Sequence, residues 1–333
     1  MRLVAPENLT PLERIQWYDT PENVSHYIYG TRGGWDKRPT PVLGWPKWIG
    51  TCWDVSVLKK DDLYHMWFSW RPHQGIGYTT SKDGVNWNVC QLVLGPNVDS
   101  PYEADEVTRP TVIYKDGLYH MWYSGHIRPY REGGVSNISY ACSTDGIHWE
   151  RPYDKPVMEA DQEWEKGSIM GPHVIFDEED QLYKLWYSAG SNHEPDAINY
   201  AESKDGVHWI KHDGPILTSD PAYEWEQHKV TGPNVVKHDG WFYMFYIGHM
   251  HEERGSVGLA RSRNGIDHWE KHPLNPIIAP EHTGFDSVSV YKPYVIKDEK
   301  GWTMWYNGAE FDEPIWVYES IGYVRHPEDD LWG

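Results

Sequence analysis

The chain has 333 residues, with 30 Lys and Arg against 50 Asp and Glu, and a formal net charge of −20 at pH 7. This acidic balance argues against nucleic acid or an anionic membrane surface as a partner, because both bind basic patches. The 20 Trp and 23 Tyr exclude a disordered chain, because disordered chains are poor in aromatic residues. We therefore expect a folded protein that binds a neutral polar ligand.

The amino-terminal residues predict a cytoplasmic protein. The sequence MRLVAPENLTPLER lacks the apolar segment of a secretory signal, and no stretch approaches 18 consecutive apolar residues. The cysteines Cys52, Cys90 and Cys142 lack the paired spacing of zinc sites, so we expect them to be reduced thiols.

We predict an irregular amino-terminal wrap over residues 1–34 and one repetitive domain over residues 35–333. A chain of this length exceeds one simple core unless the fold grows by adding units. The repeated unit begins with two strands joined by an acidic turn, and Tyr, Met and Trp alternate along the second strand with the period of two that is typical of strands. Five such pairs occupy residues 57–70, 112–125, 174–190, 235–248 and 295–308.

A turn motif, S-x-[DN]-G-x-x-W, follows the third strand of the first four units. Asp-Gly and Asn-Gly between extended runs indicate a hairpin, because both residues tolerate a positive φ. We expect the Trp of the motif to fill the gap between neighbouring sheets. The four copies are Ser81–Trp87, Ser143–Trp149, Ser203–Trp209 and Ser262–Trp269, the last with one inserted residue.

Five units and four motifs leave the last unit one strand short. Residues 35–43 are similar to the segments that follow the motifs, so we predict that they supply the missing outer strand and close a ring. The predicted fold is all-β, a five-bladed β-propeller with four antiparallel strands per blade. A six-bladed propeller with one undetected blade is the alternative.

One position in the repeat varies as a binding site would vary. Alignment on the inner-strand prolines makes Asp54, Arg109, Gly171, Gly232 and Lys292 equivalent. Inner strands of a propeller begin beside the axis, so these residues are expected to line a pocket. A structural position would repeat its residue type, whereas this one is acid, base, glycine, glycine and base.

A second repeat precedes the inner strands, where an aromatic residue is followed by an acid. Its recurrence favours a structural role, with the carboxylate accepting backbone N–H bonds, although catalysis by Glu165 or Glu226 stays open. Glu106 falls outside this register. The pairs are Tyr102-Glu103, Trp164-Glu165, Trp225-Glu226 and Phe285-Asp286.

The opening of the first blade, Trp53-Asp54-Val55-Ser56-Val57, and stretches such as VIYKDGLYHMWYSG resemble the five-bladed propeller glycoside hydrolases of families 43, 32, 62, 68, 117 and 130. The resemblance implies that Asp54 is the general base of an inverting enzyme or the nucleophile of a retaining one. Where the family pattern would place an acid in the second blade, this chain has Thr108-Arg109-Pro110-Thr111. In blades three and four it has Met170-Gly171-Pro172 and Thr231-Gly232-Pro233 instead of Glu-Gly-Pro. The general acid is therefore expected among Glu106, Glu165 and Glu226, with Glu194 and Glu310 in reserve.

We expect an exo-acting glycoside hydrolase for a small pentose- or fructose-containing oligosaccharide, similar to arabinofuranosidases and xylosidases. A glycoside phosphorylase that holds phosphate with Arg109, Lys292 and a loop histidine is one alternative, and a non-catalytic sugar-binding propeller is another. Aromatic faces stack on sugars while polar groups bind hydroxyls. The expected substrate-binding residues are Trp53, Trp70, Arg109, His126, His193, His249, Lys292 and Glu310.

No cofactor is required for this chemistry. The resemblance allows a structural calcium ion at the axis of the propeller, near His126, His193, His249 and His251, but these residues have no fixed ligand spacing.

Overall fold

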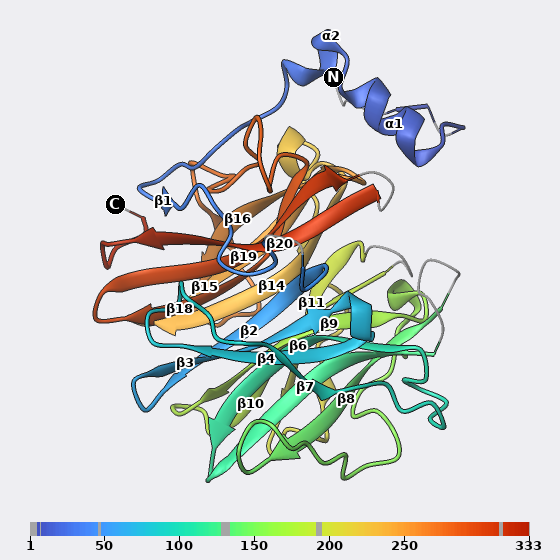
Figure 1. The fold of residues 1–333 in the computed structure, drawn as a ribbon, viewed down its shortest axis with the longest axis vertical. Helices are drawn as coiled ribbons and strands as arrows, with labels where there is room; N and C mark the ends of the chain where they lie inside the picture. The colour runs from blue at the N-terminus through green and yellow to red at the C-terminus, as the bar shows by residue number, and fades with distance from the viewer. Residues whose placement is uncertain are drawn as a thin grey trace.

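The structure, a computed structural model, describes residues 5–6, 8–45, 48–127, 134–190, 195–312 and 316–332. Five antiparallel sheets surround a common centre, where the inner strands contact one another in a closed ring (Figure 1). The predicted five-bladed propeller is therefore confirmed. Two short helices, α1 (Pro11–Tyr18) and α2 (Pro21–Val24), precede the blades.

The strands of each blade follow one another along the chain. Blade 1 contains β2 (Cys52–Lys60), β3 (Leu63–Trp70), β4 (Gly75–Ser81) and β5 (Gln91–Leu94). Blade 2 contains β6 (Glu106–Lys115), β7 (Leu118–His126) and β8 (Ser136–Ser143). Blade 3 contains β9 (Ile169–Asp177), β10 (Leu182–Ala189), β11 (Ala197–Ser203), β12 (Ile210–Lys211) and β13 (Leu217–Thr218).

The remaining two blades complete the circle. Blade 4 contains β14 (Lys229–His238), β15 (Trp241–His251), β16 (Arg254–Ser262) and β17 (Glu270–Lys271). Blade 5 contains β18 (Ser289–Asp298), β19 (Gly301–Asp312), β20 (Trp316–His326) and β1 (Asp36–Lys37). Single turns of 3₁₀ helix lie at η1 (Arg71–His73), η3 (Glu163–Glu165) and η4 (Glu224–Glu226).

The ring closes through β1, as the repeat count predicts. Asp36 pairs with Arg325 and Lys37 pairs with Val324, so the amino-terminal strand lies antiparallel to β20. A further bridge joins Leu43 to β20. In blade 2 the outermost position is held by isolated bridges to β8 instead of a named strand.

Each turn motif fixes its blade to the preceding one. In the first copy, the N–H of Gly84 donates to Ser81 Oγ at 2.9 Å, and the Gly84 carbonyl accepts a bond of 2.9 Å from the indole of Trp305 in blade 5. Trp87 packs edge-on against the same Trp305 ring. The predicted role of the motif Trp between sheets is thus confirmed. Equivalent indole bonds run from Trp67 to Gly146, from Trp122 to Gly206 and from Trp186 to Gly265.

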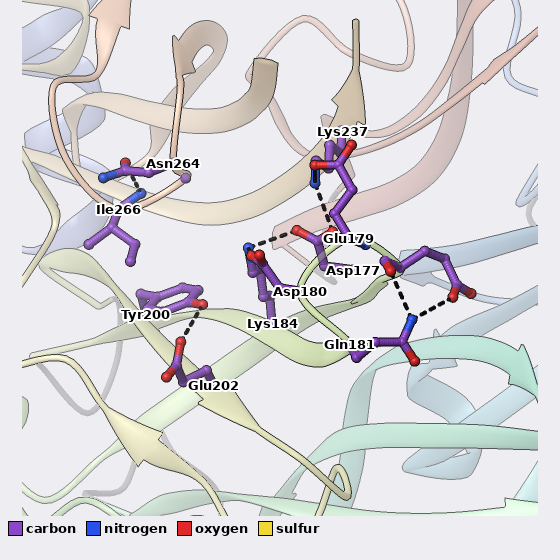
Figure 2. A network of polar contacts seen from close by, with 12 residues as sticks. Asp177, Glu179, Asp180, Gln181, Lys184, Tyr200, Glu202, Lys237, Asn264 and Ile266 are labelled. Atoms are coloured by element: carbon purple, nitrogen blue, oxygen red, sulfur yellow. Dashed lines mark hydrogen bonds and ion pairs between the residues drawn. The ribbon is translucent and has the colours of Figure 1, made fainter. Parts of the chain in front are cut away.

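An ion-pair network joins blades 3 and 4 at the β9–β10 turn (Figure 2). Asp177 Oδ2 lies 2.7 Å from Lys184 Nζ in its own blade. Asp177 Oδ1 lies 2.7 Å from Lys237 Nζ on β14. Burial raises the pKa of Asp177, but hydrogen bonds from the two lysines outweigh it and lower that pKa to about 2. Asp180 also pairs with the Lys184 ammonium group, and Glu179 also pairs with that of Lys237.

Polar side chains, one from each inner strand, connect the blades around the axis. Ser56 Oγ accepts the N–H of Val112 at 2.9 Å, and His173 Nε2 donates to the carbonyl of Val235 at 2.8 Å. These bonds brace the inner strands beneath the positions that the sequence assigns to the pocket. The set is Ser56, Thr111, His173, Asn234 and Tyr294.

Large aromatic side chains fill the interfaces between blades. Trp67, Trp122, Trp186, Trp302 and Trp305 are fully buried, and burying one such side chain contributes roughly 1.5–3 kcal/mol. Among the described residues, no helix has the length and apolar character that crossing a membrane requires.

Candidate active site

The five residues that the repeat alignment makes equivalent share one backbone conformation. Asp54, Arg109, Gly171, Gly232 and Lys292 all have a φ between 49° and 62°. Each lies at a break in the pairing of the inner strand with its neighbour. A left-handed conformation is strained for Asp, Arg and Lys. The inner strands that carry these five positions contact one another in a ring, and Arg109 contacts Asp54 while Lys292 contacts Gly171 across it.

Four of the five ring positions donate their backbone N–H to a side chain on the second strand of the preceding blade. The N–H of Arg109 donates to Ser69 Oγ at 2.8 Å, and Gly171 and Gly232 donate in the same way to Ser124 Oγ at 3.0 Å and to Ser188 Oγ at 2.8 Å. In blade 5 the equivalent residue is Asn307, whose Oδ1 accepts the N–H of Asp54 at 2.9 Å. The repeat alignment missed Asn307, although its break with the serine pattern was a readable signal.

Asp54 is 2% exposed and both of its carboxylate oxygens have partners. Asn307 Nδ2 donates to Oδ1 at 2.7 Å, and Arg109 Nε lies 3.2 Å from Oδ2. Burial raises the pKa of Asp54, while Arg109, Lys292 and Asn307 act in the opposite direction. The carboxylate is thus oriented by one amide and paired with one cation.

Lys292 extends from blade 5 towards blade 3. Its Nζ lies 3.4 Å from the carbonyl oxygen of Gly171. A Cβ on Gly171 would stand 2.8 Å from this Nζ, and a Cβ on Gly232 would stand 3.2 Å from Lys292 Cδ. The two glycines therefore make room for the lysine. Burial lowers the pKa of Lys292 to about 8, with Asp54 opposing that shift.

Two buried histidines occupy equivalent places in blades 2 and 4. His126 Nε2 lies 3.1 Å from Thr108 Oγ1, and His249 Nε2 lies 3.3 Å from Thr231 Oγ1. Burial lowers the pKa of each imidazole to about 3, so both rings are neutral at pH 7. They can exchange hydrogen bonds with hydroxyl groups without adding charge.

A second carboxylate, that of Glu319 on β20, influences the pKa of Asp54. Glu319 accepts a bond from the Tyr291 hydroxyl and lies 3.0 Å from Arg71, and its charge contributes to raising the pKa of Asp54. The Arg71 guanidinium also lies 4.3 Å above the Trp53 ring. No repeat signal marks Glu319, because it lies on a third strand and outside the aligned positions.

Glu165 and Glu226 belong to a different, repeated arrangement. Glu165 lies 2.8 Å from Lys211, accepts the Tyr187 hydroxyl at 2.7 Å and accepts two backbone N–H bonds. Glu226 binds Lys271 and the Tyr246 hydroxyl in the same way. Equivalent acid–tyrosine–cation triads are Glu103, Tyr123 and Arg151 in blade 2 and Asp286, Tyr306 and Lys37 in blade 5.

These contacts are those of the structural role that the aromatic-acid repeat favours. The described bonds of Glu165 and Glu226 lead to their own triads and not to Asp54, Arg109 or Lys292. We therefore do not retain either glutamate as a catalytic candidate.

The remaining predicted residues lie at several places around the ring. Glu106 is 8% exposed at the start of β6, opposite His126 and on the same strand as Arg109. Glu310 lies on β19 opposite Tyr318. Trp53 and Trp70 are 5% and 9% exposed, so their rings are largely covered. His193 and Glu194 lie outside the described residues.

The calcium prediction receives no support from side-chain geometry. Within the part of the chain that the structure describes, no three His, Cys, Asp or Glu side chains are grouped so that they could hold a metal ion. His126 is bonded to Thr108, and His251 is stacked on Tyr18 at 3.7 Å between ring centres.

Comparisons with known proteins agree with this architecture. The sequence profile of glycosyl hydrolases family 43 matches residues 46–318. A 1,2-beta-oligomannan phosphorylase of Thermoanaerobacter sp. (strain X514) is 33% identical, over 66% of this chain and 69% of that protein. A xylan 1,3-beta-xylosidase of Vibrio sp. is 23% identical, over 68% of this chain and 41% of that protein.

The solved structure of a thermostable family-43 glycoside hydrolase shares the fold. It superposes with a TM-score of 0.65 at 20% identity, over 90% of this chain and 91% of that one. The profile match covers most of the chain, and its residues include the axial ring from Asp54 to Lys292. The chain therefore belongs to glycosyl hydrolases family 43, and the protein is a glycoside hydrolase built on a five-bladed β-propeller.

Proposed function

We propose that the protein is an exo-acting glycoside hydrolase for short pentose- or fructose-containing oligosaccharides, and that Asp54 acts at the anomeric centre. The observation that carries this proposal is a buried carboxylate in a strained backbone conformation, held by Asn307 and Arg109 where all five inner strands begin. Strain and burial of this kind gather at functional sites. The neighbouring cations favour the ionised form, which can activate water or attack the sugar.

Glu106 is the proposed proton donor to the leaving oxygen. Hydrolysis of a glycosidic bond needs a second carboxyl group for this step. Glu106 lies outside the triad register, is 8% exposed, and starts the strand that also carries Arg109. Glu319 is bound to Arg71 and to the Tyr291 hydroxyl.

The preference for a pentose is supported by relatives. The Vibrio relative that is similar over 68% of this chain is described as a xylan 1,3-beta-xylosidase.

The test is release of p-nitrophenol from α- and β-pentosides, hexosides and furanosides. Asp54→Asn keeps the hydrogen bond to Asn307 within reach but removes the charge, so we expect kcat to fall by about 10²- to 10⁴-fold. Glu165→Gln is the matched buried control and should keep its kcat. Wild-type turnover in Asp54→Asn would refute the role of Asp54.

A glycoside phosphorylase is a second candidate, favoured by the two cations beside Asp54. Arg109 and Lys292 could bind phosphate, which would take the place of water at the anomeric carbon. The Thermoanaerobacter relative is named as a phosphorylase. A phosphorylase would release sugar phosphate and stop in phosphate-free buffer, whereas a hydrolase would continue at the same rate.

A further inference from the structure

Two exposed tryptophans lie just before the first strand of blade 1. Trp45 is 56% exposed and Trp48 is 74% exposed. An indole is among the largest apolar surfaces that a side chain can present, and tryptophans are usually well buried. The Trp48 indole is therefore available for contact with a ligand.

The segment that carries Trp48 is fixed to the rim of the active site. The Trp70 indole on β3 donates to the Ile49 carbonyl at 2.7 Å, and the N–H of Arg71 donates to the Thr51 carbonyl at 3.1 Å. On the side of blade 5, the Tyr318 hydroxyl on β20 donates to the Gly44 carbonyl at 2.8 Å. The chain then runs directly into β2, whose third residue is Asp54. Trp48 thus adjoins a braced segment at the seam between blades 1 and 5.

The tryptophans that precede and follow Asp54 on this rim have no comparable free surface. Trp53 is 5% exposed and lies beneath the Arg71 guanidinium at 4.3 Å. Trp70 is 9% exposed, bonds to Ile49 and contacts the His73 ring at 4.1 Å between ring centres. Both were predicted to stack on sugar, but their rings are engaged within the protein.

We infer that Trp48 forms a distal sugar subsite, on which a sugar unit beyond the cleaved bond stacks. The ligand class is a neutral oligosaccharide of three or more units, since the first two units are those joined by the cleaved bond. The exposed indole supplies a flat apolar face for the C–H surface of the sugar. This inference rests on the proposed function, because it places the subsite relative to Asp54.

The first test compares substrates of different length. In Trp48→Ala we expect about a tenfold rise in KM for xylotriose or arabinotriose, because loss of one stacking contact is of that order. Turnover of p-nitrophenyl monosaccharides should not change, and Trp48→Phe should restore most of the affinity. The matched control is Tyr153→Ala, an aromatic residue of blade 2 that is 48% exposed. Equal changes on long and short substrates would overturn the inference.

A binding measurement separates this inference from the proposed function. Isothermal titration calorimetry of Asp54→Asn, with and without Trp48→Ala, uses xylotriose, arabinotriose, kestose and mannotriose as probes. Weaker binding of at least one trisaccharide after loss of Trp48 supports the subsite, even if the wild-type protein cleaves none of them. Equal affinities in both proteins, or no binding to either, overturn it.

Discussion

Gly171 is the residue whose replacement tests the position of Lys292 most directly. Its φ is +62°, and an added Cβ would stand 2.8 Å from Lys292 Nζ. We expect Gly171→Ala to displace the ammonium group and lower kcat/KM at least tenfold, with a stability loss of about 1 kcal/mol from the left-handed backbone. Steady-state kinetics and urea unfolding measure the two effects.

Gly117 is the matched control for this substitution. It has a φ of +83°, and no atom lies within 4 Å of the position that a Cβ would take there. Gly117→Ala should therefore lose similar stability and keep full activity. Equal loss of activity in both variants would show that backbone strain, and not contact with Lys292, is responsible.

Lys292 also predicts an alkaline limit of activity. Burial lowers its pKa to about 8 from 10.5, so the ammonium loses its proton above that pH while Arg109 stays charged. We expect kcat/KM to fall above pH 8, and we expect Lys292→Arg to shift this alkaline fall in kcat/KM to higher pH. The unfolded state binds the proton more tightly, so stability contributed by this group rises from pH 8 to 10.5. If kcat/KM of Lys292→Met fell above pH 8 as it does in the wild type, Lys292 would not be the group responsible.

The residues of the site were predictable to different degrees. Asp54, Arg109 and Lys292 could be found because the repeat aligns them at one position where the residue type varies. Glu319 could not be recognised from the sequence, because its place in the site depends on an ion pair between β20 and Arg71 of η1. No sequence motif marks that contact. The exposure of Trp48 and the burial of Trp53 likewise depend on how the blades meet.

At the level of the strands, the acid–tyrosine–cation triads should stabilise the blades without taking part in catalysis. The Tyr187 hydroxyl donates to Glu165 and accepts from Asn199 inside blade 3. We expect Tyr187→Phe to lower the free energy of unfolding by about 1–3 kcal/mol, because it leaves buried polar groups without a partner. Activity per folded molecule should be unchanged.

Phe68 in blade 1 provides the comparison within the same protein. It occupies the place of the triad tyrosine, in the next strand position after Trp67. Phe68→Tyr should bring no gain in stability, since its hydroxyl would be buried at a position where the sequence lacks the aromatic-acid pair. A catalytic defect in folded Tyr187→Phe would return Glu165 to the candidate active-site residues.

The strands themselves were largely predictable from sequence. The alternation of Tyr, Met and Trp located all five strand pairs, and the similarity of residues 35–43 to the other outer segments predicted the pairing of β1 with β20. The outer segment of blade 2 forms isolated bridges where a full strand was expected. Short, exposed outer strands are determined by few contacts, so their extent is weakly encoded.

For the whole molecule, the seam between blades 3 and 4 depends on the network in Figure 2. Lys237→Ala would leave Asp177 with Lys184 as its remaining cation, so we expect a stability loss of about 1 kcal/mol at pH 7. Because the pKa of Asp177 is lowered to about 2, this contribution is present above about pH 4 and is lost as the pH falls towards 2. Thermal unfolding at pH 7 and pH 3 measures it, and a variant with an unchanged pH dependence would refute it.

Buried histidines predict that the propeller loses stability in mild acid. Burial lowers the pKa of His126 and His249 to about 3 and that of His173 to about 4. The unfolded chain binds these protons near pH 6.5, so each histidine lowers the free energy of unfolding by about 1.4 kcal/mol per pH unit below that value. Urea unfolding between pH 7 and 5 measures the slope.

His173→Asn should reduce this slope by the contribution of one proton, about 1.4 kcal/mol per pH unit. Ser56→Ala is the control, because it removes a polar group of the same set around the axis but no titratable group, and it should leave the slope unchanged. A slope that stays constant in His173→Asn would mean that other groups account for the acid sensitivity.

The contact between Asp54 and Asn307 also bears on when Asp54 can reach its final position during synthesis. Asp54 comes from blade 1, near the beginning of the chain, and its partner Asn307 comes from blade 5, near the end. Blades 1 to 4 can form as the chain emerges, but Asp54 has no Asn307 until the last blade is made. Bringing such distant segments together is a late and entropically costly step. If Asp54 acts as proposed, we expect its activity to appear only after the ribosome has made blade 5, and products that end before Asn307 to be inactive.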